Sequence, residues 1–341
     1  MKISLARLPT PVEKLSRLSK RYEREIFVKR DDMTDFISSG NKIRKLEFLL
    51  ADALRQKCDT VFTCGGEQSN HARATAHLCV KLGLKPVLFL RESQPEQNGN
   101  SLKKLRNFFA SDEAEQSYLK KVINGNLLLD KLLGAEIIFV TQQQYAKIDQ
   151  LFEEYREKYE SHGHKVYTIP EGGSNALGAL GYAWTVVEMT SQLDLSEFDA
   201  IYCAVGSGGT YAGLLAGLRF LGYETDVVGI NVTKKEANFF TEKVMKIIAE
   251  LSNYGIRVNI EPEEIKILDD FSGPAYAVPS EADLECIKMV ATMEGLILDP
   301  VYTSKAFRGM LQSSRRGQKI LFIHTGGTFG LFAQAHRFLE I

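Results

Sequence analysis

Short runs of β-branched and aromatic residues alternate with longer segments of helical periodicity along almost the whole chain. Amphipathic helices are predicted at 41–56, 71–83 and 239–255. Eight runs are apolar on both faces, as buried parallel strands are: 25–32, 60–64, 86–90, 136–140, 165–170, 200–205, 227–232 and 319–325. This alternation predicts an α/β protein with mainly parallel sheet, flanked by helices on both sides.

Three predicted strands end in glycine-rich turns that lead into helices. These junctions are CGGEQSN at 64–70, AVGSGGTYAG at 204–213 and HTGGTFG at 324–330. In open α/β sheets, ligands bind at the carboxyl ends of strands, where helix N-termini point. Any one junction could be a tight turn only, but three of them in one chain favour a shared ligand-binding cleft.

One stretch, about 92–126, interrupts the alternation. It is polar apart from a short amphipathic patch that includes Leu102, Leu105, Phe108 and Phe109. We interpret it as a surface insertion with one or two helices; a lid or an oligomer contact is the alternative.

Length and charge narrow the function classes. A chain of 341 residues predicts two domains or one large α/β unit. Its 42 Lys+Arg against 43 Asp+Glu remove the polybasic signal of nucleic-acid or anionic-membrane binders. With 25% charged and 44% hydrophobic residues, wholesale disorder is also excluded.

The cysteines and the N-terminus bear on the cellular compartment. Five cysteines, an odd count without a CxxC pair, argue against a disulfide framework or a zinc site. His162 and His164 lack acidic or cysteine companions, so no metal site is expected there. Residues 1–20 hold no continuous apolar core, and no apolar run approaches about 18 residues. We therefore expect a cytoplasmic protein without membrane or nucleic-acid partners.

Lys42 is the first candidate for catalysis, because it opens an amphipathic helix after Gly40 and Asn41. A helix N-terminus is electropositive and lowers the cost of a deprotonated lysine. A neutral lysine can form a Schiff base with a carbonyl cofactor. Lys45, one turn later, faces the same way and could contact a phosphate. On its own this pattern is weak, since a lysine in a first helical turn is usually solvated.

The junction at 204–213 resembles a dinucleotide fingerprint but lacks its third glycine, because Tyr211 stands there. No Walker lysine follows it either. Ser207, Gly208, Gly209 and Thr210 would present backbone N–H groups and two hydroxyls to one phosphate. This suits a monophosphate cofactor and makes a nicotinamide dehydrogenase improbable. The alternative is a close helix–sheet contact that requires glycine.

At the first junction, Ser69, Asn70 and His71 follow a Gly-Gly turn and begin a helix. Simple N-capping explains Ser and Asn there. The functional interpretation is a carboxylate-binding helix N-terminus, with the Asn70 amide touching a cofactor oxygen.

Together these segments resemble a known family across nearly the whole chain. The chain is similar to pyridoxal-phosphate (PLP) enzymes of the tryptophan-synthase-β fold type, in the branch of D-cysteine desulfhydrase and 1-aminocyclopropane-1-carboxylate deaminase. The matching segments are LPTPVEKL (8–15), KRDD (29–32), GNKIRKLEFL (40–49), GGEQSNHAR (65–73), EGGSNALGALGY (171–182), GPAYAVP (273–279), LDPVYTSKA (298–306) and HTGG (324–327).

The resemblance implies a fold and an assembly. It implies two domains, each an open, mainly parallel twisted sheet flanked by helices, with the cofactor between them. The expected large domain comprises 1–48 and 166–341, and the small domain comprises 49–165 with the insertion at about 92–126. The resemblance also suggests a homodimer in amino-acid metabolism.

The resemblance further implies roles at the cofactor. Lys42 would form the Schiff base with pyridoxal 5'-phosphate and later move protons. Lys45 and the loop Ser207, Gly208, Gly209 and Thr210 would hold the phosphate. Asn70 would hydrogen-bond the pyridine 3-hydroxyl oxygen.

On the substrate side, the resemblance places Ser69, Asn70 and His71 around the substrate carboxylate. Tyr276 and Tyr302 would line the substrate pocket. Catalysis would then rest on Lys42, Ser69 and the two tyrosines.

Two positions near the pyridine nitrogen separate the branches. The deaminases have Glu after the motif tyrosine and Leu before the late Gly-Gly, whereas this chain has Thr303 and Thr325 there. A carboxylate would keep the ring nitrogen protonated and make a strong electron sink, which opening a cyclopropane needs. A threonine hydroxyl cannot hold that proton, and hydrosulfide leaves more easily than carbon.

We therefore expect a lyase that performs α,β-elimination on a small amino acid, with D-cysteine giving pyruvate, hydrogen sulfide and ammonia. The alternatives are 1-aminocyclopropane-1-carboxylate deaminase, L-cysteate sulfo-lyase, and a non-catalytic protein that binds PLP or an amino acid. Substrate chirality does not follow from the sequence.

Overall fold

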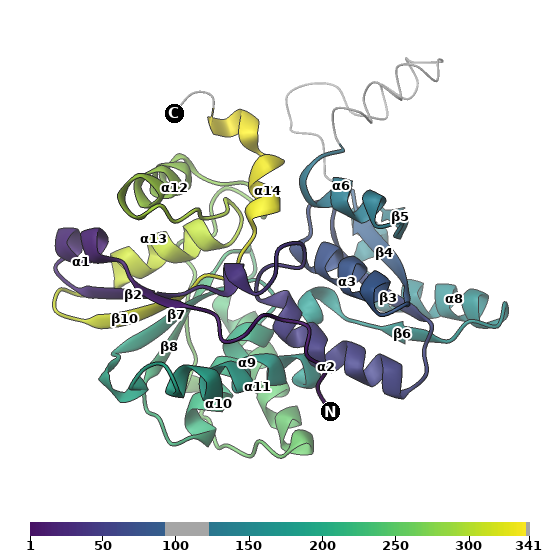
Figure 1. Ribbon diagram of the computed structural model, residues 1–341, viewed down its shortest axis with the longest axis horizontal. Coiled ribbons are helices and arrows are strands. Elements are labelled where there is room, and N and C mark those ends of the chain that lie inside the picture. The colour runs from purple at the N-terminus through teal and green to yellow at the C-terminus, as the bar shows by residue number, and fades with distance from the viewer. Residues whose placement is uncertain (93–122, 339–341) are drawn as a thin grey trace.

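The computed structural model describes residues 1–92 and 123–338 (Figure 1). In these residues, a six-stranded sheet has the order β1-β2-β10-β7-β8-β9 and a four-stranded sheet the order β5-β4-β3-β6. The strands are β1 Val12–Lys14, β2 Glu25–Lys29, β3 Thr60–Gly66, β4 Lys85–Arg91, β5 Glu136–Val140, β6 Val166–Thr168, β7 Ala200–Val205, β8 Asp226–Asn231, β9 Lys266–Leu268 and β10 Lys319–Ile323.

Helices cover both sheets. Those of the first half are α1 Ser16–Tyr22, α2 Lys42–Arg55, α3 Asn70–Lys81, α6 Gly125–Leu132, α7 Gln142–Tyr145 and α8 Ile148–Glu160. Those of the second half are α9 Ala176–Thr190, α10 Gly209–Phe220, α11 Ala237–Leu251, α12 Glu281–Glu294, α13 Thr303–Ser313 and α14 Thr328–Phe332. Short 3-10 turns lie at Asp31–Met33, Glu171–Gly173, Leu195–Glu197, Ser252–Tyr254, Pro262–Glu264 and Ala335–Phe338.

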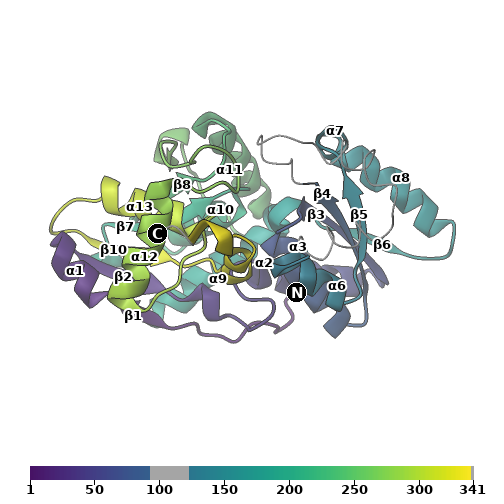
Figure 2. The same ribbon diagram turned by 90° about the horizontal axis from the view of Figure 1, so that it is seen from above.

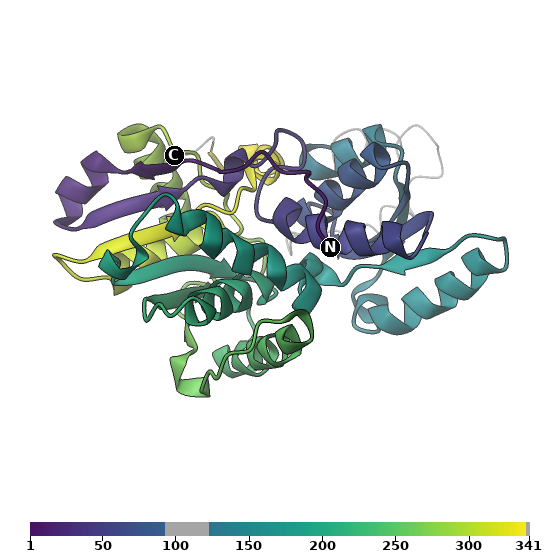
Figure 3. The same ribbon diagram turned by 60° about the horizontal axis from the view of Figure 1, so that its bottom comes forward.

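Both chain ends build the large sheet, because β2 pairs with β10 in parallel, Glu25 opposite Lys319. Every recorded strand pair is parallel except β1–β2. In Figure 1 the two sheets lie side by side, and Figures 2 and 3 show this two-part arrangement from other directions. The predicted α/β class, with two mainly parallel sheets flanked by helices, is confirmed.

All eight predicted strands are present, but the sequence pattern missed β1 and β9. Each has three residues and lies at an edge of the large sheet. Neither strand contains a fully buried residue, so neither shows the continuous apolar run of a central strand. The predicted insertion at 92–126 falls largely outside the described residues, and its last two residues begin α6.

The residue limits of the two domains remain a prediction. β6 hydrogen-bonds to β3 in the four-stranded sheet, with Thr60 opposite Val166. The expected limit at 165/166 would separate these paired strands. We therefore propose to move the limit past Thr168.

The core forms layers on both faces of each sheet. Helices α9, α10 and α11 pack on one face of the large sheet, while α1, α12 and α13 pack on the other. The small sheet is covered by α2 and α3 on one face and by α8 on the opposite face. There Phe89 packs edge-on against Phe152 with ring centres 5.0 Å apart. These layers fix the carboxyl ends of the strands, where the glycine-rich junctions lie.

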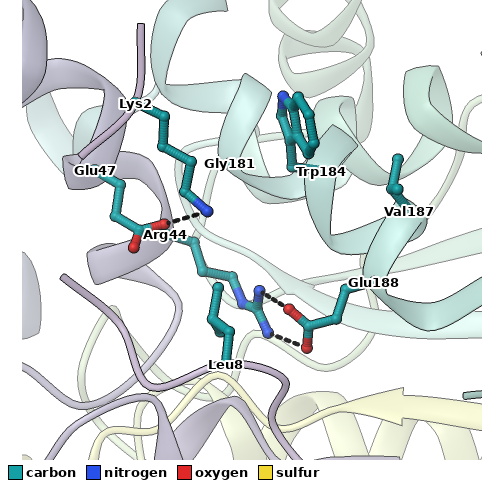
Figure 4. A pocket seen from close by; sticks show the side chains of 8 residues that line it. All are labelled: Lys2, Leu8, Arg44, Glu47, Gly181, Trp184, Val187 and Glu188. Carbon is teal, nitrogen blue, oxygen red and sulfur yellow. Dashed lines mark hydrogen bonds and ion pairs between the residues drawn. The ribbon is translucent and has the colours of Figure 1, made fainter. Parts of the chain in front are cut away.

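A buried ion network anchors α2. Arg44 donates to both carboxylate oxygens of Asp31 at 2.9 and 2.7 Å, and to Glu188 on α9 at 2.8 Å. The Tyr182 hydroxyl donates to Asp31 at 2.6 Å. Figure 4 shows the Arg44–Glu188 pair in a cavity of about 200 Å³. The KRDD segment thus supplies Asp31 to hold the helix that carries Lys42 and Lys45.

Other sequence expectations concern the cysteines and membrane helices. All five cysteines are free and buried. Cys64 is 1% exposed and packs in an apolar cluster, so it is a small apolar core residue. Within residues 1–92 and 123–338, no helix has the length and apolar character to cross a membrane. The same ranges contain no cluster of His, Cys, Asp or Glu that could hold a metal ion.

Candidate active site

Lys42 is the first residue of α2, and its amine faces the ring of Tyr302. Its Nζ lies 2.9 Å from Oδ1 of Asn41 and 5.9 Å from the centre of the Tyr302 ring. Burial and, to a smaller extent, the nearby Arg73 lower the pKa of Lys42 from 10.5 to about 8, against the opposing effect of Asp299. About a tenth of this amine is therefore neutral at pH 7 and half at pH 8, which provides the neutral form that a Schiff-base lysine requires.

The lysine loop contacts the third glycine-rich junction. The backbone N–H of Asn41 donates to the carbonyl oxygen of Thr325 at 3.2 Å. Gly40 has a φ of +104°, and a Cβ there would lie 2.5 Å from the same oxygen. Glycine is therefore required at 40 both by its backbone angle and by this close approach. The half-buried Thr325 thus contacts the loop that precedes Lys42, and its place near the pyridine nitrogen stays a prediction.

The predicted phosphate loop forms the start of α10. Gly208 is its N-cap, with a φ of +87°, and Gly209 and Thr210 are its first residues. The Asn41 amide donates to the Thr210 hydroxyl at 3.0 Å, which ties the loop to the lysine segment. A twelve-residue helix presents free N–H groups and positive potential at this end.

Lys45 reaches the same loop through a residue that the sequence analysis did not single out. Its Nζ donates to Oγ of Ser174 at 3.1 Å and to the carbonyl oxygen of Gly172 at 3.2 Å. Ser174 Oγ lies 2.7 Å from Oγ of Ser207. Burial holds the pKa of Lys45 well below its usual value, and Lys42 adds to this. An anion at this position would favour the protonated amine.

Ser69 and Asn70 lie at the N-terminus of α3, where we predicted a carboxylate site. Ser69 is the N-cap, and its hydroxyl accepts from the N–H of Ala72 at 3.1 Å. Asn126 donates to Oδ1 of Asn70 at 3.2 Å. This bond orients the Asn70 amide so that its NH₂ group remains able to donate. The backbone N–H groups at the helix start can bind an anion.

The imidazole of His71 points away from this anion site and into the core. The Thr63 hydroxyl donates to the carbonyl oxygen of Ile169 at 2.9 Å, so it accepts from Nε2–H of His71, also at 2.9 Å. Burial holds the pKa of His71 well below its usual value, so the ring is neutral. We therefore predict that His71 binds the substrate carboxylate through its backbone N–H and not through its imidazole.

Tyr276 and Tyr302, for which we predict a place on the substrate side, contact each other. Their hydroxyls are hydrogen-bonded, and their rings are nearly perpendicular with centres 6.3 Å apart. Burial raises the pKa of Tyr302 well above its usual value, and that of Tyr276 is raised too. Both hydroxyls therefore stay protonated at neutral pH.

Thr303 is fully buried, and its hydroxyl is hydrogen-bonded to Asp299. Its hydroxyl donates to Oδ1 of Asp299 at 2.8 Å and accepts from the Asp299 N–H at 2.6 Å. Asp299 also accepts from the backbone N–H groups of Val301, Tyr302 and Thr303. Both oxygens of the Asp299 carboxylate thus accept hydrogen bonds from the turn that leads into α13.

His324, at the start of the third glycine-rich junction, is fully buried. Its Nδ1 accepts from the N–H of Gly326 at 3.2 Å, and its Nε2 lies 2.9 Å from the carbonyl oxygen of Ile297. Both ring nitrogens are therefore used, and Nε2 carries the proton. This leaves the imidazole without a free position for acid–base chemistry.

The residues brought together fit pyridoxal phosphate. A neutral lysine suits the aldehyde, a helix N-terminus with a buried lysine suits one phosphate, and the Asn70 amide suits a ring oxygen. The chain matches the family described as "Pyridoxal-phosphate dependent enzyme" over residues 3–326. The chain belongs to this family. Pyridoxal phosphate is therefore its cofactor, as the sequence predicted.

Named relatives cover nearly the full length. A Thermotoga maritima protein named "Putative 1-aminocyclopropane-1-carboxylate deaminase" is 54% identical over 338 residues, 99% of both chains. A Serratia proteamaculans "D-cysteine desulfhydrase" is 41% identical, covering 97% of this chain and 95% of that protein. A solved "ACC deaminase homologue" is 36% identical with a TM-score of 0.85, covering 99% and 95%. The resemblance to this branch is thereby confirmed.

Proposed function

We propose that the protein performs α,β-elimination on a small amino acid, with D-cysteine converted to pyruvate, hydrogen sulfide and ammonia. The observation that carries this choice is the pairing of Thr303 with Asp299. We further propose a cytoplasmic homodimer that needs neither nucleic acid nor membrane. Relatives bearing both desulfhydrase and deaminase names support the wider reaction class equally.

When bound, pyridoxal phosphate supplies an electron sink for the pair of electrons left at the substrate Cα. At position 303 the chain offers a hydroxyl whose hydrogen already points to Asp299. The Asp299 carboxylate accepts hydrogen bonds on both oxygens, so it is not free to hold a proton on a ring nitrogen. A weaker sink suffices when hydrosulfide leaves, but not when a carbon must leave.

The chain's own residues take the following parts in this proposal. The neutral amine of Lys42 would accept the proton from the substrate Cα. The N–H groups of Asn70 and His71 hold the substrate carboxylate, with the Ser69 hydroxyl beside them. Tyr302, protonated and within 6 Å of Lys42 Nζ, lines the path of that proton.

A second candidate is 1-aminocyclopropane-1-carboxylate deamination. It is supported by the name of the Thermotoga maritima relative, which is 54% identical to this chain. Against it stands Thr303, which cannot supply the carboxylate that we associate with cyclopropane opening. A protein that binds PLP without catalysis is a further alternative, and the presence of Lys42 argues against it.

The test uses purified holoenzyme with D-cysteine, L-cysteine, L-cysteate, D-serine and 1-aminocyclopropane-1-carboxylate. We expect sulfide and pyruvate from D-cysteine, and little 2-oxobutyrate from the cyclopropane substrate. Strong 2-oxobutyrate formation without sulfide would refute the proposal. Lys42→Ala should abolish both the visible absorption of the bound cofactor and turnover. A variant that keeps both would show that Lys42 is not the Schiff-base lysine.

A further inference from the structure

The turn at residues 272–278, between β9 and α12, carries Tyr276. Inside it, the N–H of Val278 donates to the carbonyl oxygen of Ala275 at 3.1 Å. Ala277 has a φ of +62°, a backbone region that a residue with a Cβ adopts only at a cost in free energy. Such a conformation persists only where surrounding contacts hold it in place.

Lys305 on α13 supplies such a contact. Its side chain is fully buried, and its Nζ donates to the carbonyl oxygen of Ser272 at 2.6 Å and more weakly to that of Ala275 at 3.4 Å. Burial lowers the pKa of Lys305 to about 8, so most of the amine is charged at pH 7. A buried ammonium is costly unless its N–H groups are bonded. A displaced turn would therefore leave this charge without its partners.

The same helix also contacts the tip of Tyr276. Tyr302 is the N-cap of α13, and Lys305 lies in its first turn. The hydroxyl of Tyr302 is bonded to that of Tyr276, and the Tyr302 ring lies 5.9 Å from Nζ of Lys42. One helix thus holds the turn at its backbone and at the end of its tyrosine side chain. These two contacts set the position of Tyr276 relative to Tyr302.

We propose that Lys305 is a positioning residue, which fixes the backbone of the Tyr276 turn and thereby sets how tightly the site binds a small amino acid. This inference rests on the proposed function, which places Tyr276 on the substrate side, and deepens it. The alternative is a lysine that only stabilises the fold. The two differ in one measurable respect, because a positioning residue changes amino-acid binding through Tyr276.

The test titrates alanine, in both chiral forms, into the holoenzyme and follows the visible absorption of the bound cofactor. Alanine has no leaving group at Cβ, so binding is measured without elimination. In Lys305→Met we expect alanine to bind about tenfold more weakly, because the turn loses its charged donor. The spectrum before alanine is added should stay unchanged, since Lys42 and the phosphate loop are intact. Lys305→Arg should recover part of the affinity.

A double-mutant cycle shows whether Lys305 acts through Tyr276. Tyr276→Phe alone should weaken alanine binding. Adding Lys305→Met to it should cause little further loss, because the hydroxyl that Lys305 positions is already absent. Additive losses overturn the inference, and so does an unchanged affinity in Lys305→Met.

Arg24→Met is the matched control, since Arg24 holds the opposite end of α13 in a similar way. Its Nη1 donates to the carbonyl oxygens of Leu311 and Ser314 at 3.1 and 2.8 Å. The control should lower the urea midpoint of unfolding and leave alanine affinity unchanged. A loss of affinity as large as that in Lys305→Met would make a general weakening of α13 the cause, and would overturn the inference.

Gly273→Ala tests the same contact from the side of the turn, should Lys305→Met not fold. Gly273 has a φ of +72°, and a Cβ there would lie 3.1 Å from Nζ of Lys305 and 2.9 Å from the carbonyl oxygen of Val278. This variant should also weaken alanine binding, and an unchanged affinity overturns the inference. Failure of the proposed function looks different: the alanine affinities follow the expected pattern, but D-cysteine gives neither sulfide nor pyruvate.

Discussion

Arg44 offers the sharpest test of how α2 is held. It lies between Lys42 and Lys45 in sequence but points to the opposite side, into the ion network with Asp31 and Glu188. Arg44 is 2% exposed and Asp31 is fully buried. We predict that Arg44→Met destabilises the protein strongly and weakens cofactor retention, because both site lysines are on this helix.

The magnitude follows from what the substitution leaves behind. Glu188 keeps the ammonium of Lys29 as a partner, so its charge stays compensated. Asp31 keeps only neutral donors, the hydroxyls of Tyr182 and Thr10. Removing one partner of a buried ion pair typically costs about 3–5 kcal/mol. Since one of the two carboxylates keeps a cation, we expect a loss near the lower limit, about 3 kcal/mol.

Urea unfolding followed by fluorescence measures this loss. Trp184, the single tryptophan, lies on α9 and lines the cavity beside Arg44. Arg55→Met is the control, because Arg55 is on the same helix but pairs with Asp52 at the exposed surface. Its unfolding midpoint should match that of the parent protein. If Arg44→Met unfolds at the same urea concentration as Arg55→Met, the network does not stabilise α2.

Three further predictions concern the site. Thr303→Glu places a second carboxylate beside buried Asp299, so we expect a lower urea midpoint and little 2-oxobutyrate; a highly active deaminase would contradict this. The apoprotein should capture pyridoxal phosphate faster as pH rises through 8, where half of the Lys42 amine is neutral, and the rate should level off about one pH unit higher. A rate that is constant from pH 6 to 8 would contradict that cause. Ser174→Ala removes the hydroxyl bonded to Lys45, so the cofactor should dissociate on dilution about tenfold faster; unchanged retention would exclude this role.

Local patterns predicted most of the fold. Strands of parallel sheets often form continuous apolar runs, so the eight strands other than β1 and β9 could be located from sequence. The glycine-rich strand ends could be located as well, because the strand end, the glycines and the helix start all lie within ten residues of sequence. The edge strands β1 and β9 escaped, since three residues with mixed exposure carry no periodic signal.

Contacts between distant segments could not be predicted. Arg44 meets Asp31 and Glu188 across 13 and 144 residues, and nothing in the KRDD segment shows that its first Asp is buried there. Ser174 joins Lys45 to Ser207 in the same way. The available signal for Ser174 was the Ser-Asn pair after Gly-Gly in the 171–182 segment. Such a pair is also typical of a helix start, and Asn175 is indeed the N-cap of α9.

His71 shows a different limit. A helix start predicts which backbone N–H groups are free, and that part of the carboxylate hypothesis still stands. It does not predict the direction of each side chain, because successive helical residues point about 100° apart. Thr63 on β3 completes the hydrogen bond that turns the imidazole inward, and this partner is known only from the tertiary structure.

The state of Lys42 depends on tertiary structure for the same reason. From sequence, the helix N-terminus was the reason to expect a neutral lysine. A macrodipole changes the energy of a nearby charge by about 0.3–1 kcal/mol, which is less than one pKa unit. The pKa of Lys42 falls from 10.5 to about 8, and burial is the largest cause, followed by Arg73 on α3. The two halves of the molecule therefore make this amine nucleophilic together, and a change that exposes it to water should raise its pKa even where α2 stays intact.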